Sequence, residues 1–358
     1  MSGGAAAQYP PPTRHEIAYA GPTCRPSSTM TAQPPPIEAS RVAARDAAVI
    51  CDLTPLSVIA VTGVDAAPFL QGQVSADVNG LPPGGCRYAS FNTPKGRMLA
   101  NFLLWREVSG EGFWILLPDD IAAPVVKRLT MYKLRSKVTL TDVSHDTVRL
   151  GIGGPDGAAA VAAAMGSAPA SFDTRVFGAA TLIGVPGPRF VVVAPAAEAD
   201  AIRSRFAGHA TPAPFEVWQW LTLRAGVPVI GAATQDAFVA QAANWDILGG
   251  IDFKKGCYTG QEIIARTQYL GRLKERTFLF HVEVPHVAPG TRIFSGAFGD
   301  QACGTVVNAA PAPGSGCDVL AVLQIAAYER GDARLQTPEG PPLIALSLPY
   351  PIPGVRDT

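Results

Sequence analysis

Short strand-like runs alternate with short helical segments between residues 49 and 206. Strands are expected at residues 87–92, 98–105, 113–117, 148–152, 181–185 and 190–194, and helices at 119–134, 157–165 and 196–206. A further short helix is expected after Asp65, whose side chain can cap it. The first two strands are joined by Thr93-Pro94-Lys95-Gly96, a turn sequence that predicts a hairpin. Strands interleaved with short helices are typical of an α+β fold.

The length of the chain and its Pro-rich stretches divide it into several parts. At 358 residues it exceeds what one hydrophobic core usually supports, so about two or three domains are expected. Residues 1–44 are rich in Pro, Ala and Gly and are expected to be a disordered extension. The parts expected after it are an N-terminal α+β region at 45–210 with an inserted α+β subdomain at about 146–210, a return segment at 211–275, and a small β-barrel or sandwich at 276–358.

Composition and charge limit the classes of function. Lys and Arg number 29, as do Asp and Glu, so the total charge does not indicate a dedicated nucleic-acid or membrane-surface binder. No apolar run approaches the roughly 20 residues of a membrane-spanning helix. The N-terminus also lacks the pattern of a secretion signal, so a cytoplasmic protein is expected. The six cysteines form no CxxC pair and no Cys/His cluster, so neither a disulfide framework nor a metal site is expected.

One glycine pattern weakly resembles a dinucleotide-binding turn. Gly151, Gly153 and Gly154 follow a predicted strand and precede a predicted helix. Asp156 stands where the last glycine of GxGxxG is needed. A tight turn is therefore the favoured interpretation.

The run FKKGCYTGQE around Cys257 carries the strongest chemical signal. Thr259 and Glu262 have the spacing of a capping box, which predicts that a helix begins directly after Thr259. A sulfur near a helix N-terminus, with Lys254 and Lys255 beside it in sequence, lies in a positive potential that favours a thiolate. Two interpretations stay open: a reactive or ligand-binding thiol, and a buried structural cysteine.

Two groups of cations flank this motif in sequence. Lys95 and Arg97 lie on the predicted hairpin turn, and the second group consists of Arg266, Arg272, Lys274 and Arg276. If both groups converge with the motif lysines, they would hold an anionic tail such as a polyglutamate or a phosphate. The alternative is that these are solvated loop charges that never meet.

The residues 255–262, KGCYTGQE, resemble the K-G-C-Y-x-G-Q-E signature of the YgfZ family, the folate-binding relatives of the glycine-cleavage T-protein. Two more stretches agree with this family. They are FLQGQ at residues 69–73 with Asp77, and PKGR at residues 94–97. The resemblance covers residues 49 to 350.

This resemblance implies a T-protein-like architecture of three domains around a central folate-binding opening, ending in a β-barrel. It implies tetrahydrofolate or a folate derivative as cofactor, a role in assembly or repair of iron–sulfur client proteins, and an indirect link to tRNA thiomodification. Cys257 would be the residue on which function depends, facing the same space as the folate. The expected folate-binding residues are Lys255, Gln261 and Glu262 of the motif with Lys95, Arg97 and Arg266. No ligand set for a resident cluster is visible, since a stable cluster usually needs several thiolates.

Two other functions remain as alternatives. True T-proteins carry an aspartate on the strand after the hairpin, where this sequence has Ala100 and Asn101. Neither residue can act as a carboxylate, which disfavours a tetrahydrofolate-dependent aminomethyltransferase. If the protein is an enzyme, a folate-dependent one-carbon transferase is expected. The second alternative is a non-catalytic scaffold in which Cys257 only packs.

Overall fold

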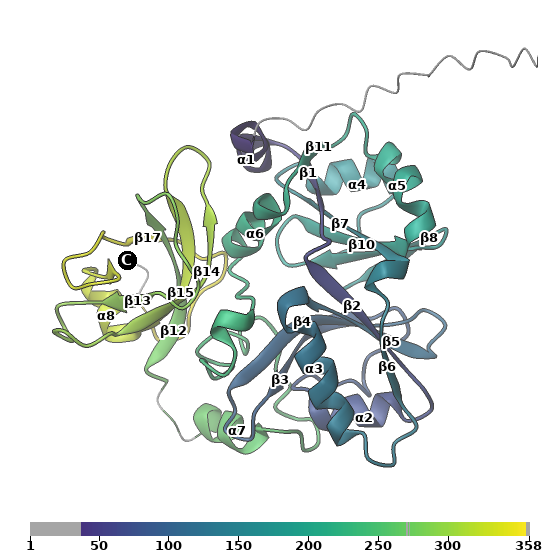
Figure 1. The fold of residues 1–358 in the computed structure, drawn as a ribbon, viewed down its shortest axis with the longest axis horizontal. Coiled ribbons are helices and arrows are strands. Elements are labelled where there is room, and N and C mark those ends of the chain that lie inside the picture. Colours follow the sequence, from purple (N-terminus) through teal and green to yellow (C-terminus); the bar gives the residue numbers. More distant parts are fainter. Residues whose placement is uncertain (1–36, 270, 272, 356–358) are drawn as a thin grey trace, which may run out of the picture. The chain divides into compact units, whose positions relative to one another are not determined.

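Three β-sheets and the helices packed on them form the described part of the chain (Figure 1). The computed structural model describes residues 37–355 except 270 and 272. These described residues form one compact unit. The predicted α+β class is confirmed, because helices pack on sheets in which the described strand pairs are antiparallel, apart from β1 with β11.

The predicted hairpin is confirmed and begins a five-stranded sheet of order β3-β4-β5-β2-β6. Its strands are β2 (Leu56–Thr62), β3 (Cys86–Asn92), β4 (Met98–Arg106), β5 (Gly112–Pro118) and β6 (Thr139–Asp142). At the turn, the Thr93 amide donates to the Arg97 carbonyl (2.8 Å) and the Gly96 amide donates to the Thr93 carbonyl (2.9 Å). The helices α2 (Ala66–Gln73) and α3 (Asp119–Tyr132) share an apolar core with one face of this sheet.

A second sheet has the order β11-β1-β7-β10-β9-β8. Its strands are β1 (Val49–Asp52), β7 (Thr147–Gly153), β8 (Thr174–Phe177), β9 (Ala180–Val185), β10 (Arg189–Pro195) and β11 (Thr211–Ala213). The helices α4 (Gly157–Met165) and α5 (Ala199–Arg205) share a core with it. Because β1 and β11 both belong to this sheet, the predicted subdomain at 146–210 is completed by residues on either side of it.

The helix α6 (Phe215–Arg224) packs closely on this second sheet. A Cβ added to Gly151 would lie 2.5 Å from the ring of Trp218, and one added to Gly153 would lie 2.8 Å from Leu221. The two glycines of β7 therefore allow α6 to approach the sheet. The turn that follows has Gly154 at a φ of +99°, as the tight-turn interpretation requires.

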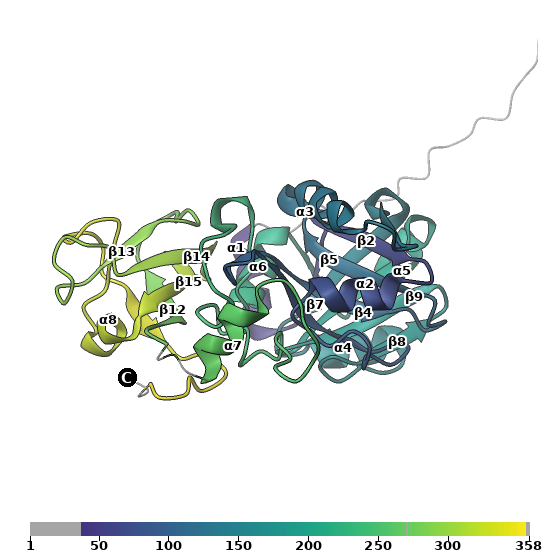
Figure 2. The ribbon, with the colours of Figure 1, turned by 90° about the horizontal axis from the view of Figure 1, so that it is seen from below.

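The third sheet, of order β16-β13-β14-β15-β12-β17, is curled into part of a barrel (Figure 2). Its elements are β12 (Glu275–Val282), β13 (Arg292–Phe294), β14 (Gly304–Pro311), β15 (Cys317–Gln324), α8 (Ile325–Arg330), β16 (Arg334–Leu335) and β17 (Ile344–Leu346). It encloses its own apolar core, to which Phe278, Val306 and Leu323 contribute. The predicted C-terminal β-region is thus present as a curled sheet.

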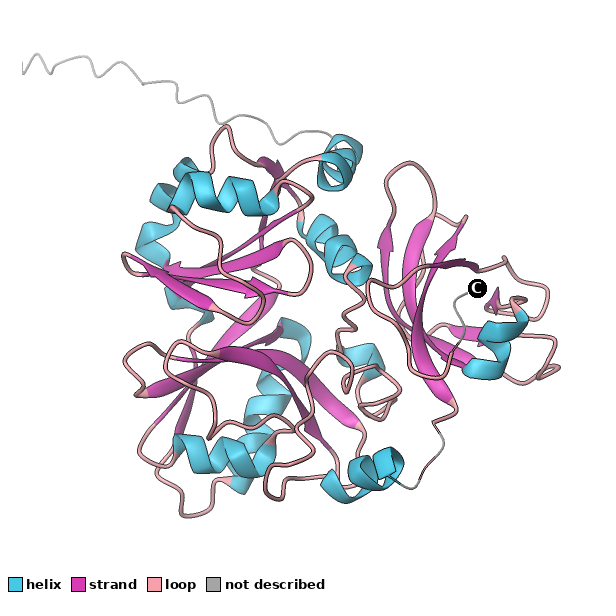
Figure 3. Cartoon of the chain, turned by 180° about the vertical axis from the view of Figure 1, so that it is seen from behind, coloured by secondary structure: helices cyan, strands magenta, loops and turns pink. Residues whose placement is uncertain are grey.

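The chain between α6 and α7 (Gln261–Tyr269) is mostly loop and lies where the three sheets meet (Figure 3). Its Trp245 shares one core with Tyr88 of the first sheet, Val191 of the second and Leu320 of the third. A loop in this position needs internal partners for its polar groups, because water does not reach them.

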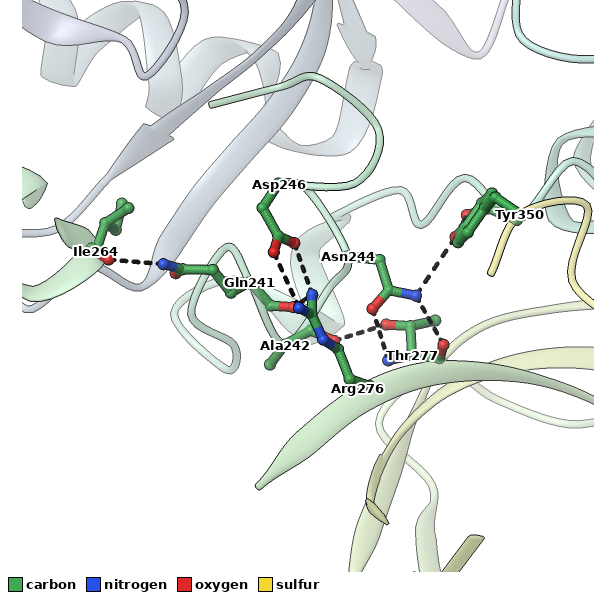
Figure 4. Close-up of polar contacts among 9 residues, drawn as sticks. Gln241, Ala242, Asn244, Asp246, Ile264, Arg276, Thr277 and Tyr350 are labelled. Atoms are coloured by element: carbon green, nitrogen blue, oxygen red, sulfur yellow. Dashed lines mark hydrogen bonds and ion pairs between the residues drawn. The ribbon is translucent and has the colours of Figure 1, made fainter. Parts of the chain in front are cut away.

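Those partners come largely from the start of β12 (Figure 4). Arg276 donates to both carboxylate oxygens of Asp246, at 2.6 and 2.9 Å, and to the Gln241 carbonyl at 2.8 Å. Asn244 donates from Nδ2 to the Thr277 carbonyl at 2.8 Å. Arg276 is buried and paired, so it does not belong to the surface basic group expected from the sequence.

Two local predictions near the N-terminus are wrong. Residues 37–44 of the expected disordered extension lie in α1 (Ile37–Asp46), which buries Ser40 and Ala44; the rest of that extension, residues 1–36, lies outside the described residues. Asp65 does not cap α2 with its side chain. Its carboxylate instead accepts from the Lys137 amide at 2.7 Å, a partner that lies 72 residues away in sequence.

Candidate functional site

The loop that carries Cys257 is fastened at its start by Asp252. The Asp252 Oδ1 accepts the backbone amides of Lys254 (2.7 Å) and Lys255 (3.0 Å). The Asp252 amide donates to the carbonyl of Ser75, just after α2 (2.9 Å). The motif loop is therefore held to the end of α2 by one backbone hydrogen bond, and the Asp252 carboxylate shapes the start of the loop.

Lys255 fastens the same two segments through its side chain. Its Nζ donates to the carbonyls of Gln71, Val74 and Ala76, at 2.8, 2.6 and 2.7 Å. A positive charge at the C-terminal end of α2 is favoured by the helix dipole. Burial lowers the pKa of Lys255 to about 8.

This geometry leaves Lys255 no hydrogen-bond donor for the folate contact that the sequence predicts. An ammonium group has three N–H donors, and the three carbonyls use all of them. The Lys255 ammonium also lies 4.9 Å from the ring centroid of Tyr258. Lys255 is therefore a positioning residue for the loop, and its ammonium has no free donor for a ligand.

The hairpin turn packs directly against the start of α7. A Cβ on Gly96 would lie 3.1 Å from Cβ of Ile263, and one on Gly260 would lie 2.5 Å from the Thr93 carbonyl oxygen. Gly260 also has a φ of +84°, a conformation that L side chains rarely adopt. The two motifs lie more than 150 residues apart in sequence and meet at these two glycines.

The predicted helix start is displaced by one residue. The helix α7 begins at Gln261, after the left-handed Gly260, and not directly after Thr259. Cys257 thus lies four residues before the helix, where the effect of its dipole is weaker than expected. The Gln261 side chain donates from Nε2 to the Lys255 carbonyl at 3.4 Å, within the motif itself.

Cys257 is exposed, so the interpretation of a buried structural cysteine is wrong. The other described cysteines are all buried. Burial raises the pKa of Cys51 and Cys86 to about 12 and that of Cys303 to about 11. Among the described residues, Cys257 is therefore the thiol that a partner can reach without unfolding the chain.

The hairpin and α7, which carry three of the cations expected to converge, lie against each other. Lys95, Arg97 and Arg266 are all exposed, and the turn that carries the first two lies against the helix that carries the third. Arg97 donates to the backbone carbonyls of Asp236 and Ala237, so part of its guanidinium is already engaged. Glu262 is exposed as well, and Arg272 lies outside the described residues.

Two adjoining hollows lie at the meeting of the sheets. The smaller one, of about 80 Å³, is named the inner hollow here and is lined by Tyr88, Asn101, Arg189, Trp218 and Trp245 among others. The outer one, of about 440 Å³, shares Leu56, Pro118 and Trp218 with it. Cys257 and the cations Lys95, Arg97 and Arg266 line neither hollow. The expectation that thiol, cations and folate share one space is therefore not met by these hollows.

The aromatic lining of the inner hollow was not predicted. Tyr88 and Trp245 lie with ring centroids 5.1 Å apart, and the Trp245 Nε1 is buried with no hydrogen-bond partner. In the sequence, both rings have the pattern of ordinary core residues. Only the meeting of β3 with the loop after α6 brings them to one wall.

Asn101, one of the two residues that the sequence comparison sets against the T-protein aspartate, is hydrogen-bonded to the backbone through both ends of its amide. Its Nδ2 donates to the Pro228 carbonyl at 2.7 Å, and its Oδ1 accepts the Ile230 amide at 2.8 Å. The side chain is buried and holds the loop that follows α6. It offers no carboxylate for proton transfer, which continues to disfavour aminomethyl transfer.

Two kinds of feature are missing from the described part of the chain. Residues 37–355, less 270 and 272, contain no helix long and apolar enough to cross a bilayer. Within the same ranges, no group of three or more His, Cys, Asp and Glu side chains is placed to hold a metal ion.

Comparisons with known proteins place these features in context. The model of the GCVT N-terminal domain family matches residues 6–195. The tRNA-modifying protein YgfZ of Escherichia coli O157:H7 (strain EC4115 / EHEC) is 36% identical over 222 residues, covering 61% of this chain and 67% of that protein. The protein of the same description from Shigella boydii serotype 4 (strain Sb227) is 36% identical over 223 residues, with the same coverage.

A solved structure with low sequence identity to this chain has a similar fold. The glycine cleavage system aminomethyltransferase T from Bartonella henselae aligns with a TM-score of 0.69, covering 87% of this chain and 89% of that one. Sequence identity over the alignment is 16%, so this likeness establishes the architecture alone. The T-protein-like architecture predicted from the sequence is confirmed by it.

Proposed function

This chain belongs to the GCVT N-terminal domain family and, within it, to the YgfZ proteins. We propose that it is a folate-binding factor that supports tRNA modification and the assembly or repair of iron–sulfur proteins, and that it acts through Cys257. One observation carries the proposal. The Cys257 thiol is exposed on a loop that Asp252 and Lys255 fasten to the end of α2.

An exposed and fixed thiol suits chemistry on a partner molecule. Of the two protonation states of a cysteine side chain, the thiolate is the one that acts as a nucleophile and as a metal ligand. Because no further His, Cys, Asp or Glu cluster in the described part could complete a metal site, any cluster that Cys257 meets would be held by a client protein. The fastened loop would present the sulfur in one orientation and lower the entropy lost on docking.

Folate is proposed to bind in the outer hollow, of about 440 Å³, with its ring system against the aromatic wall where the inner hollow adjoins it. Tyr88, Trp218 and Trp245 provide aromatic surface there, and the unpaired Nε1 of Trp245 is a buried donor without a partner. Flat heteroaromatic rings stack well on such side chains. Bound tetrahydrofolate would supply a carrier for one-carbon units.

The predicted contacts of the glutamate tail do not fit these hollows. The cations Lys95, Arg97 and Arg266 lie outside the lining, whereas Asp119 and Asp120 line the outer hollow. Carboxylates repel an anionic tail. The proposal for folate therefore rests on the ring system and assigns no residue to the tail.

A complementation experiment tests the role of the thiol. In a bacterium that lacks its own YgfZ protein, the wild-type chain is expected to restore thiolated tRNA nucleosides, measured by mass spectrometry of digested tRNA. Cys257→Ser should fail to restore them, and Cys303→Ala, which removes a buried thiol, should succeed if it accumulates as folded protein. Full restoration by Cys257→Ser would exclude the proposed role.

Calorimetry tests the folate site separately from the thiol. Tetrahydrofolate is expected to bind the wild type and Cys257→Ser with equal affinity, because Cys257 lines neither hollow. Trp245→Leu should weaken binding by about fivefold or more, as expected for the loss of one aromatic stacking contact. Absence of binding to the wild type would remove folate from the proposal and leave the complementation result unaffected.

A further inference from the structure

A dense group of cations lies at the C-terminal end of α3 and in the loop after it. We call residues 127–137 the α3 tip. Five cations occur in this stretch: Lys127, Arg128, Lys133, Arg135 and Lys137. Residues 121–141 contain no Asp or Glu, so this segment is strongly positive within a chain whose formal charge is zero.

None of these five cations is neutralised within the described part of the chain. In the described residues no ion pair and no hydrogen bond is made by any of these five side chains, whereas the Arg276 side chain in the core makes three such contacts. Lys127, Arg135 and Lys137 are exposed, and the other two are half-buried. Unpaired positive charge of this density attracts a polyanion.

The α3 tip is held in place by the turn before α2. The Lys137 amide donates to the Asp65 carboxylate, and the Asp65 amide donates to the Lys137 carbonyl, at 2.7 and 3.3 Å. A Cβ on Gly63 would lie 2.2 Å from that carbonyl oxygen. Leu134, in the middle of the tip, has a φ of +46°, unusual for a residue with a branched side chain. The cations are thus displayed from a fixed backbone.

An aromatic ring and two apolar side chains stand among the cations. Tyr132 is 38% exposed, and its ring packs edge-on against Phe91 with centroids 6.5 Å apart. Met131 is 63% exposed and Leu134 is 90% exposed. Exposed rings beside unpaired Lys and Arg are the features with which proteins hold unstacked nucleic-acid bases and their phosphates.

A bilayer surface fits this region less well than a nucleic acid. Membrane-surface helices keep a long apolar face free for the lipid. In α3 that face, including Ile121, Val125 and Leu129, is buried against the sheet, so exposed apolar surface is limited to the last turn. What remains is a compact cationic surface with one supported ring.

We infer that the α3 tip is a tRNA-docking surface, with phosphates on its cations and an unstacked base on the ring of Tyr132. This inference rests on the tRNA link of the proposed function and gives that link a location distinct from Cys257. The loop carrying Cys257 is fastened to α2, which packs with α3 on the same face of the first sheet. The α3 tip contacts the turn before α2, whereas the Cys257 loop is fastened to the other end of that helix.

Binding of unfractionated bacterial tRNA to the full chain tests the inference. Lys133→Ala/Arg135→Ala is expected to weaken binding on the order of tenfold at moderate salt and to reduce the slope of log affinity against log salt by about 1.4–1.8. The control Arg175→Ala/Arg292→Ala removes two exposed, unpaired cations elsewhere and should change affinity less than twofold. Tyr132→Ala should weaken binding about fivefold or more, and Tyr132→Phe should restore it.

Each outcome decides for or against the α3 tip. Equal losses in the two double variants, or wild-type binding by Lys133→Ala/Arg135→Ala, would overturn the inference. The inference would also be overturned if Lys133→Ala/Arg135→Ala bound tRNA like the wild type but lost binding to phosphatidylglycerol vesicles, because the α3 tip would then be a lipid-binding surface. Cys257→Ser should bind tRNA like the wild type while failing in complementation, so failure of the docking surface is distinguishable from failure of the proposed thiol chemistry.

Discussion

The Cys257 loop and the inner hollow are built in opposite ways. Apart from Phe253 and Tyr258, which pack on the central core, the loop is held by hydrogen bonds from Asp252 and Lys255, which leave Cys257 exposed. The hollow is walled by buried side chains such as Tyr88 and Trp245, and its polar residue Asn101 is tied to the backbone. The comparison teaches that only part of the signature motif is free for chemistry, because the rest maintains the position of the loop.

The largest expected contrast between the two regions is thiol reactivity. Cys257 should react with a maleimide reagent at least a hundredfold faster than Cys51, Cys86 and Cys303, because a buried thiol reacts only after an opening that costs several kcal/mol. Site-resolved mass spectrometry after short labelling times measures the rates. Comparable labelling of Cys86 and Cys257 in native protein would abolish the distinction between loop and hollow.

Substitution of Asn101 by Asp tests how much the hydrogen bonds of Asn101 in the inner hollow contribute to the free energy of unfolding. The new carboxylate would face the Pro228 carbonyl in place of the amide donor, in a buried site. We expect the free energy of unfolding to fall by about 3–5 kcal/mol, as for an uncompensated buried charge. The measurement is urea unfolding. Asn79→Asp, which adds the same charge at an exposed position, serves as control and should change stability by less than about 0.5 kcal/mol.

The two glycines of the motif should differ sharply when replaced by Ala. Gly260→Ala places a Cβ 2.5 Å from the Thr93 carbonyl at a left-handed φ, so we expect a loss of about 2–4 kcal/mol from strain and overpacking. A Cβ on Gly256 meets nothing within 4 Å, so Gly256→Ala should be nearly neutral. Equal stability of the two variants in urea unfolding would contradict the packing of the hairpin turn on α7.

The smallest expected effect separates the two motif lysines. Lys255→Met leaves the carbonyls of Gln71, Val74 and Ala76 without their donor, which should cost about 1–3 kcal/mol. Lys254 is exposed and its side chain has no partner in the described part of the chain, so Lys254→Met is the matched control. If Lys255→Met leaves stability unchanged but abolishes tetrahydrofolate binding, Lys255 is a ligand contact and not a positioning residue.

Several features of the fold followed from local sequence. The Pro94-Gly96 turn between two apolar runs specified the hairpin, because only a few residues have the backbone geometry such a turn needs. The acidic start of the segment at 119–134 favoured a helix there, and α3 begins with Asp119 and Asp120. The motif around Cys257 marked the exposed thiol, although the residue types alone left its burial open.

What the tertiary structure decided are contacts between residues far apart in the chain. Lys255 and the end of α2 lie about 180 residues apart in sequence, and nothing local to either predicts that three carbonyls occupy the ammonium. Likewise, Asp is a residue type that caps helices, but the carboxylate of Asp65 accepts a hydrogen bond from the Lys137 amide and does not cap α2. Sequence determines which groups a residue offers. Chain topology determines which partner lies close enough to bind those groups, because a hydrogen bond needs its donor and acceptor atoms within about 3 Å of each other.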